Sequence, residues 1–154
     1  MICYVVGRGD LMDSSAIFRK FVAFSAAVHQ VTNDMTKDVK SEAITAVQYK
    51  ILEYIAVSQP CILSDISECM HMSMPNTSRE LKKLTDKLLC EKVTDTEDRR
   101  KHYIRLSAKG QTMMDNIFAQ IETRFNERIQ GFSEIELKEI EQALDVLHNK
   151  VFYT

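Results

Sequence analysis

The sequence contains few of the residues that interrupt regular structure. It has four glycines and two prolines among 154 residues, while 45% of its residues are hydrophobic and 27% are charged. This composition argues against a β-sandwich and against a disordered chain, and it favours a mainly helical protein. A chain of this length forms one core of ordinary size, or a small domain with an appended oligomerisation arm.

Long apolar runs and paired cysteine motifs are also missing. No run approaches the roughly 18 apolar residues that cross a bilayer, and the first ten residues lack the pattern of a secretion signal. The four cysteines, at positions 3, 61, 69 and 90, show no CxxC spacing. We therefore expect reduced thiols, with Cys69 and Cys90 as small buried hydrophobes, in a cytoplasmic protein that does not enter a membrane.

The sequence lacks the motifs of common enzymes. It contains no G-x-S-x-G, H-E-x-x-H, P-loop or dinucleotide fingerprint, and so few glycines leave little room for a phosphate cradle. Cys69 and His71 lie near each other, but their spacing is not that of a zinc site. We expect no enzymatic activity, no catalytic residue, no metal ligand and no cofactor.

Charge is distributed unevenly along the chain. The net charge is −2, yet residues 79–109 carry ten Lys and Arg against six Asp and Glu, and the segments on both sides are net acidic. A protein that is acidic overall can still present a positive surface to phosphates. The basic segment is therefore the first place to look for function.

Capping signals and apolar spacing predict four helices before the basic segment ends. The first runs from Ser15 to about Asn33, and the second starts at about Ala46 behind a capping box of Thr45 and Gln48. A short helix follows over residues 64–70. Ser73 then opens a helix that we expect to reach about Leu88, with Leu81, Leu84 and Leu88 buried and Asn76, Thr77 and Arg79 among its more exposed residues.

The texture then changes to two short stretches with strand character. Residues 89–94 and 102–106 flank the charged segment 95–101, which predicts a β-hairpin with a basic tip. Two more helices follow, opened by Ser107 and Ser133. Helix, helix, turn, helix and hairpin over about residues 45–107 is the order of a winged helix-turn-helix domain, although short helices in this order also occur in other helical cores.

Two groups of residues in this arrangement are suited to binding duplex DNA. The first two turns of the helix opened by Ser73 carry small polar and basic groups, as expected where such a helix meets base edges: Ser73, Asn76, Thr77, Ser78, Arg79, Lys82 and Lys83. Arg99, Arg100 and Lys101 lie at the hairpin tip, where an arginine can enter a narrow minor groove. Taken alone, the tip would suit a solvated loop neutralised by its own acidic residues. Beside the helix, DNA binding is the better interpretation.

Three segments resemble one family of regulators. They are D-R-R-K-H-Y-I-R-L-S-A-K-G at 98–110, S-M-P-N-T-S-R-E-L-K-K-L at 73–84 and A-V-Q-Y-K-I-L at 46–52. On these residues the chain resembles the MarR family of transcription factors. The resemblance implies that Arg100 reaches the minor groove and that Asp98 braces the wing. Leu88 departs from it, because the family usually has glycine there, and Lys92 stands where arginine is common.

The resemblance also implies an assembly. It suggests a homodimer, most often a repressor, on a pseudo-palindromic operator. We expect an N-terminal extension at 1–10, a dimerisation helix within 11–40, the DNA-binding lobe at 41–107 and C-terminal dimerisation helices at 108–154. The apolar spacing from Ile140 to Val151 would suit a helix of an intrachain core equally well. A winged helix that binds protein instead of DNA is the alternative function.

The signal that such a regulator senses is open at this stage. In the family, effectors often bind between the dimer arm and the DNA-binding lobe. The residues that we expect to line such a pocket for a small aromatic effector are Phe21, Phe24, His29, Tyr49 and Tyr54. Aromatic residues at helical spacing are more often core residues, and thiol oxidation or zinc sensing are further alternatives.

Overall fold

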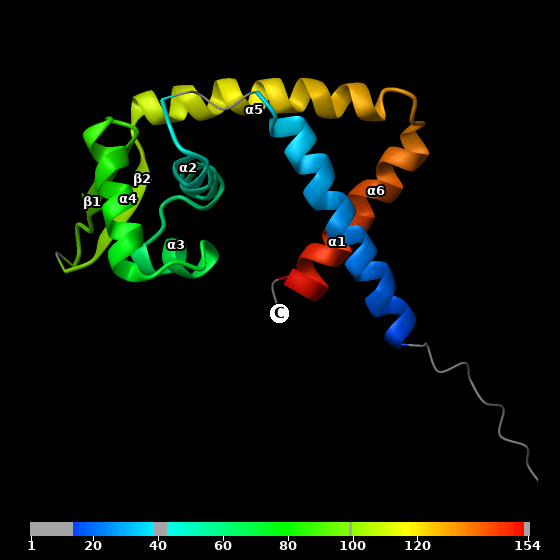
Figure 1. The fold of residues 1–154 in the computed structure, drawn as a ribbon, viewed down its shortest axis with the longest axis horizontal. Helices are drawn as coiled ribbons and strands as arrows, with labels where there is room; N and C mark the ends of the chain where they lie inside the picture. The colour runs from blue at the N-terminus through cyan, green and yellow to red at the C-terminus, as the bar shows by residue number, and fades with distance from the viewer. Residues whose placement is uncertain (1–13, 39–42, 99, 153–154) are drawn as a thin grey trace, which may run out of the picture. The chain divides into compact units, whose positions relative to one another are not determined.

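The computed structural model describes residues 14–38, 43–98 and 100–152 (Figure 1). The chain divides into two units, residues 1–37 and 38–154. The first contains helix α1 (Ser14–Thr36), which confirms the helix predicted over 15–33. Large apolar side chains on α1 are exposed, namely Ile17, Phe18, Val22, Phe24 and Val28. The extension expected at 1–10 lies outside the described residues.

Three helices of the second unit form the helical part of the winged helix-turn-helix: α2 (Ala46–Ser58), α3 (Leu63–Cys69) and α4 (Met74–Asp86). The capping box before α2 is confirmed, since Gln48 N–H donates to Thr45 Oγ1 at 3.2 Å and Thr45 N–H donates to Gln48 Oε1 at 3.3 Å. Ser73 caps α4 by accepting a hydrogen bond from Asn76 N–H at 3.4 Å. Both caps satisfy backbone donors that a helix start leaves open.

The predicted hairpin is confirmed. Strands β1 (Cys90–Thr94) and β2 (His102–Leu106) pair antiparallel, with Cys90 opposite Leu106 and Thr94 opposite His102. Two further backbone hydrogen bonds join Cys61 to Ile104, with N···O distances of 3.2 and 2.7 Å. The hairpin is thus tied to the loop between α2 and α3, and the structure has the predicted fold class, mainly helical with a small β-hairpin wing.

The turn between α4 and β1 differs from the prediction. The helix ends at Asp86, and Leu88, which we expected to be buried, is 67% exposed with a φ of 60°. Leu88 N–H donates to Thr85 O and Leu89 N–H to Leu84 O, both at 2.9 Å, which is the Schellman arrangement of a helix end. Because Leu88 takes the left-handed position, the chain reverses there and Leu89 enters the core in its place.

One core holds these elements together. Its fully buried side chains come from α2, α3, α4 and the first half of α5 (Ala108–Ile129), and the largest are Ile51, Leu52, Ile55, Ile66, Leu84 and Met114. We call residues 43–118 the winged lobe. At its edge, a Cβ at Gly110 would overlap the backbone carbonyl oxygen of Leu89. Only glycine therefore lets α5 approach the turn before β1 this closely.

Beyond the winged lobe the chain continues as helix. The capping box of Ser133 and Glu136 is confirmed at the start of α6 (Glu134–Leu147), which is followed by a short π-helical turn, η1 (His148–Phe152). No residue of α6 is buried, and Ile135, Leu144 and Val146 are each more than half exposed. Within the described ranges, no helix has the length and apolar character to cross a membrane.

Candidate nucleic-acid interface

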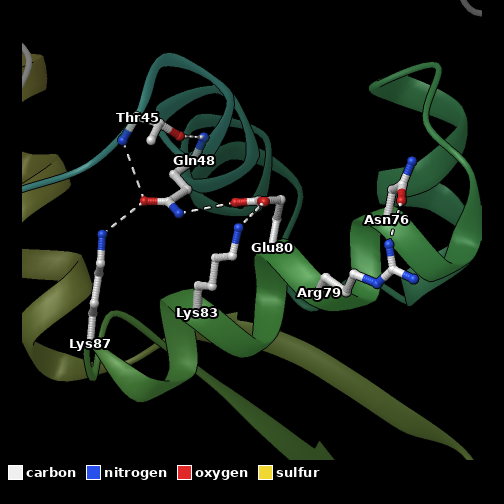
Figure 2. A network of polar contacts seen from close by, with 7 residues as sticks. All are labelled: Thr45, Gln48, Asn76, Arg79, Glu80, Lys83 and Lys87. Atoms are coloured by element: carbon white, nitrogen blue, oxygen red, sulfur yellow. Dashed lines mark hydrogen bonds and ion pairs between the residues drawn. The ribbon is translucent and has the colours of Figure 1, made fainter.

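The outward side of α4 carries most of the predicted recognition residues. Its exposed residues include Ser73, Asn76, Ser78, Arg79, Lys82 and Lys83. Figure 2 shows the Arg79 guanidinium beside the Asn76 amide, to whose oxygen it donates at 3.3 Å. This contact holds the arginine close to the helix start, where a recognition helix meets base edges.

Thr77 is an exception among these residues. Its side chain is fully buried, and its hydroxyl donates to the Ser73 backbone oxygen at 3.1 Å. Thr77 lies four residues before Leu81 and seven before Leu84, so it shares their inner face of the helix. The expectation that Thr77 is exposed and contacts DNA is therefore wrong; it is a core residue.

Lys83 is engaged by a carboxylate of its own helix. Its Nζ lies 2.6 Å from Glu80 Oε1, and the amide of Gln48 donates to the other carboxylate oxygen at 3.0 Å (Figure 2). The hydrogen bonds from Lys83 and then from Gln48 lower the pKa of Glu80. Lys83 therefore offers a phosphate less net charge than Lys82.

The wing tip is folded by its acidic residues. Asp95 Oδ1 accepts hydrogen bonds from the N–H groups of Glu97 and Asp98 at 2.7 and 3.0 Å, and Asp98 Oδ1 accepts one from Arg100 N–H at 3.0 Å. The hydrogen bonds from the backbone N–H groups of Asp98 and then of Glu97 lower the pKa of Asp95. Acidic side chains in this loop hold backbone donors, and the side chains of Arg100 and Lys101 remain exposed. Arg99 lies outside the described residues.

Sequence reasoning assigned the brace of the wing to Asp98 and did not identify Asp95. The signal was present in the sequence, because an aspartate that opens a tight turn commonly accepts hydrogen bonds from the N–H groups that follow.

A groove of about 900 Å³ lies between α4, the wing and the start of α3. We call it the basic groove, because the lysine and arginine side chains that line it come from α4 and the hairpin: Lys82 from α4, and Lys92, Arg100 and Lys101 from the hairpin, with His102 also in the lining. Leu81, Tyr103 and Ile104 supply apolar lining, and Asp65, Asp86 and Glu91 also border it. Of the predicted residues, Ser78 and Lys82 of the helix and Arg100 and Lys101 of the tip line this groove, whereas Asn76 and Arg79 do not. Lys92 and His102 also line it, although the sequence did not single them out as contacts.

The predicted effector residues belong to two helices. Phe21, Phe24 and His29 lie on α1, while Tyr49 and Tyr54 lie on α2. Tyr49 is 2% exposed in the core of the winged lobe, and its hydroxyl donates to Glu53 Oε1 at 2.9 Å. Burial, and then the bond to Glu53, raises the pKa of Tyr49 above its usual range. Tyr49 is therefore a core residue in this structure, and the other four remain predictions.

The described thiols occupy different environments. Cys61 and Cys90 are buried, and burial raises the pKa of Cys61 to about 11. Cys69 is exposed, so the expectation of a buried Cys69 is wrong. In the part of the chain that the structure describes, no three His, Cys, Asp or Glu side chains gather where they could hold a metal ion.

Comparisons with known proteins agree with this architecture. Residues 44–102 match the model of the MarR family. The HTH-type transcriptional regulator BilQ of Clostridioides difficile (strain CD3) is 27% identical over 114 residues, which cover 72% of this chain and 75% of that protein.

Solved structures show the same fold at lower identity. A MarR family protein from Bacillus stearothermophilus superimposes with a TM-score of 0.72 at 19% identity, covering 90% of this chain and 96% of that one. Staphylococcus aureus MarR in complex with salicylate and kanamycin has a TM-score of 0.67 at 19% identity, covering 89% of this chain and 93% of that one. S. aureus MepR bound to ethidium bromide has a TM-score of 0.61 at 20% identity, covering 84% of this chain and 94% of that one.

Proposed function

We propose that this chain, whose residues 44–102 match the model of the MarR family, is a transcription regulator of that family that binds a specific duplex DNA sequence as a homodimer. The observation that carries the proposal is the basic groove. It is lined by Lys82 of α4 and by Arg100 and Lys101 of the wing. A recognition helix in the major groove and a wing arginine at the adjacent minor groove would use these two elements together.

The roles of the residues follow from where they lie. Asn76, Ser78 and Arg79 are exposed near the start of α4, so they would contact base edges, with Ser73 beside them at the helix cap. Lys82 and Lys101 would bind phosphates, and Arg100 would enter the minor groove. Lys83 would contribute less because it is paired with Glu80.

Apolar surface on the helices outside the winged lobe supports the homodimer. Large apolar side chains are exposed on α1, and Phe125, Ile135 and Leu144 are exposed on α5 and α6. Exposed apolar surface of this extent marks an interaction site. A two-fold dimer would present two α4 helices to half-sites about one turn of DNA apart, so the operator would be a pseudo-palindrome.

The proposed activity is repression relieved by a small aromatic effector. Two of the similar solved structures contain small molecules, salicylate with kanamycin in one and ethidium in the other. Phe21, Phe24, His29 and Tyr54 are the candidate contacts in this chain. Equilibrium binding of the selected operator with and without salicylate or ethidium tests this part, and an unchanged operator affinity with both compounds would count against it.

The test of DNA binding starts with a selection of genomic fragments by the purified full chain, followed by titration of the selected fragment. Arg100→Ala should weaken operator binding by about 1 to 3 kcal/mol, the range for a good groove contact. Arg105→Ala is the matched control, because Arg105 lies on the same hairpin but its Nε donates to Glu91 Oε1 at 2.6 Å. Equal affinities of the Arg100→Ala variant and the unmodified chain would reject the wing assignment.

Salt dependence separates this proposal from a winged helix that binds protein. Several phosphate contacts release counterions, so operator affinity should fall steeply and log-linearly as salt rises. A chain that selects no fragment and binds duplexes weakly at low salt would favour the protein-binding alternative.

A further inference from the structure

Gln48 is a buried polar side chain that joins the start of α2 to α4. It is 3% exposed, and both ends of its amide form hydrogen bonds (Figure 2). The oxygen accepts from Thr45 N–H at 3.3 Å and from Lys87 Nζ at 3.0 Å, and the nitrogen donates to Glu80 Oε2 at 3.0 Å. Gln48, which belongs to the capping box of α2, therefore also forms tertiary contacts with the predicted recognition helix and with Lys87 at the end of that helix.

These contacts hold α4 at two places along its length. Glu80 lies in the middle of the helix and Lys87 at its C-terminal cap, about 10 Å further along the axis. Lys87 Nζ also donates to the backbone oxygen of Ala43 at 2.6 Å. Hydrogen bonds are directional, whereas apolar packing is not, so two of them fix the rotation of a helix that its apolar stripe alone would leave less defined.

The predicted DNA contacts surround the first attachment point. Arg79 precedes Glu80 in the chain, and Lys83, one turn later, is bonded to the Glu80 carboxylate at 2.6 Å. A rotation of α4 about its axis would displace Asn76 and Arg79 relative to base edges. Gln48 itself lies in the interior and has no access to DNA.

We propose that Gln48 is a positioning residue for DNA recognition, whose amide sets the rotation of α4 by bonding Glu80 and Lys87 at once. The inference rests on the proposed function and deepens it. It predicts that loss of the bridge lowers discrimination between operator and random DNA, because base contacts carry the sequence information while phosphate contacts supply most nonspecific affinity.

The chemistry of the bridge suggests a reciprocal exchange as the test. Q48E retains oxygen acceptors for Thr45 and Lys87 but sets two carboxylates against each other, which like charges at short range oppose. In the double variant Q48E/E80Q the amide and the carboxylate trade places. The same hydrogen bond can then form with its direction reversed, and the net charge is that of the unmodified chain.

The experiment measures the ratio of dissociation constants for random and operator duplexes of equal length, at one salt concentration, for each full-length variant. Q48E should lower this ratio by roughly tenfold, as expected when a buried charge-assisted hydrogen bond is replaced by a repulsion. Q48E/E80Q should restore it to within about twofold. Q120E on α5 is the control for added charge, since Gln120 is exposed and outside this network.

Each outcome decides a separate point. An unchanged ratio in Q48E, or no recovery in Q48E/E80Q, rejects the positioning role. An unmodified chain that does not distinguish operator from random DNA rejects the proposed function itself. If circular dichroism shows Q48E to be unfolded, K87M against the exposed control K50M decides instead. A ratio that falls about threefold in K87M and does not fall in K50M supports the positioning role. Equal ratios in K87M and K50M reject it.

Discussion

The winged lobe and the helices outside it differ in how much of their apolar surface a single chain buries. Residues 43–118 bury their apolar side chains against one another, and six of the large ones, including Leu52 and Leu84, are fully enclosed. α6 buries no residue at all, although Ile135 and Leu144 are among its side chains. The contrast teaches that the winged lobe has its own core, whereas the flanking helices carry apolar surface that a partner would cover.

The largest expected effect tests how tightly the winged lobe is closed. Gly110→Ala would place a methyl group on the carbonyl oxygen of Leu89, and backbone on both sides leaves little room to yield. We expect the free energy of unfolding to fall by about 3 kcal/mol, as for severe overpacking, even though alanine is the better helix former. Chemical denaturation of the variant and the unmodified chain measures the difference.

Gly131→Ala is the matched control for this substitution. A Cβ at Gly131 would meet nothing within 4 Å, so its stability should stay within about 0.5 kcal/mol of the unmodified chain. Equal stabilities of the two alanine variants would show that the winged lobe is less closely packed at α5 than the comparison requires.

A second, smaller effect tests whether a partner chain covers the exposed apolar surface of α6. If α6 lies in a dimer interface, Leu144→Glu should remove about 2 kcal/mol of apolar burial from each protomer and dissociate the dimer. Sedimentation velocity at micromolar concentration should then show a dimer for the unmodified chain and a monomer for the variant. Thermal unfolding of the winged lobe should change little, because Leu144 is 55% exposed in one chain.

Gln142→Glu controls for the added charge in that experiment. It lies two residues before Leu144, and therefore on the opposite side of the helix. A Leu144→Glu variant that remains dimeric would place the interface elsewhere, and a monomeric unmodified chain would remove the case for a homodimer.

Local signals predicted the elements well because the physics involved is local. The boxes at Thr45 and Ser133 and the cap at Ser73 determine helix starts within three residues of sequence. Thr77 was expected to be exposed, although its spacing to Leu81 and Leu84 puts it on their buried face. Its hydroxyl bonds the preceding turn, which allows burial. Capping signals at the helix start did not predict where α4 ends, which is at Asp86 and not at about Leu88.

The candidate site was predictable only in part. Polar and basic residues at the start of α4 and at the wing tip were evident from the sequence, but the groove that joins them depends on the hairpin folding beside the helix. The second use of Gln48 was not evident. Its capping role explains a glutamine at that position completely, and its contact with Glu80 joins residues 32 positions apart.

The smallest expected effect concerns the turn at Leu88, where the sequence departs from the family that it resembles. Leu88 holds a φ of 60°, which costs a residue with a Cβ about 1 kcal/mol or more, while its exposed side chain gains little from packing. Leu88→Gly should therefore stabilise the winged lobe by about 1 kcal/mol despite the flexibility of glycine. Leu88→Ala keeps the Cβ and should give no such gain, so denaturation of both variants separates backbone strain from the loss of an exposed leucine. A destabilised Leu88→Gly variant would mean that the leucine side chain packs on a surface that a single chain does not contain, and the turn would then belong with the flanking helices in the comparison.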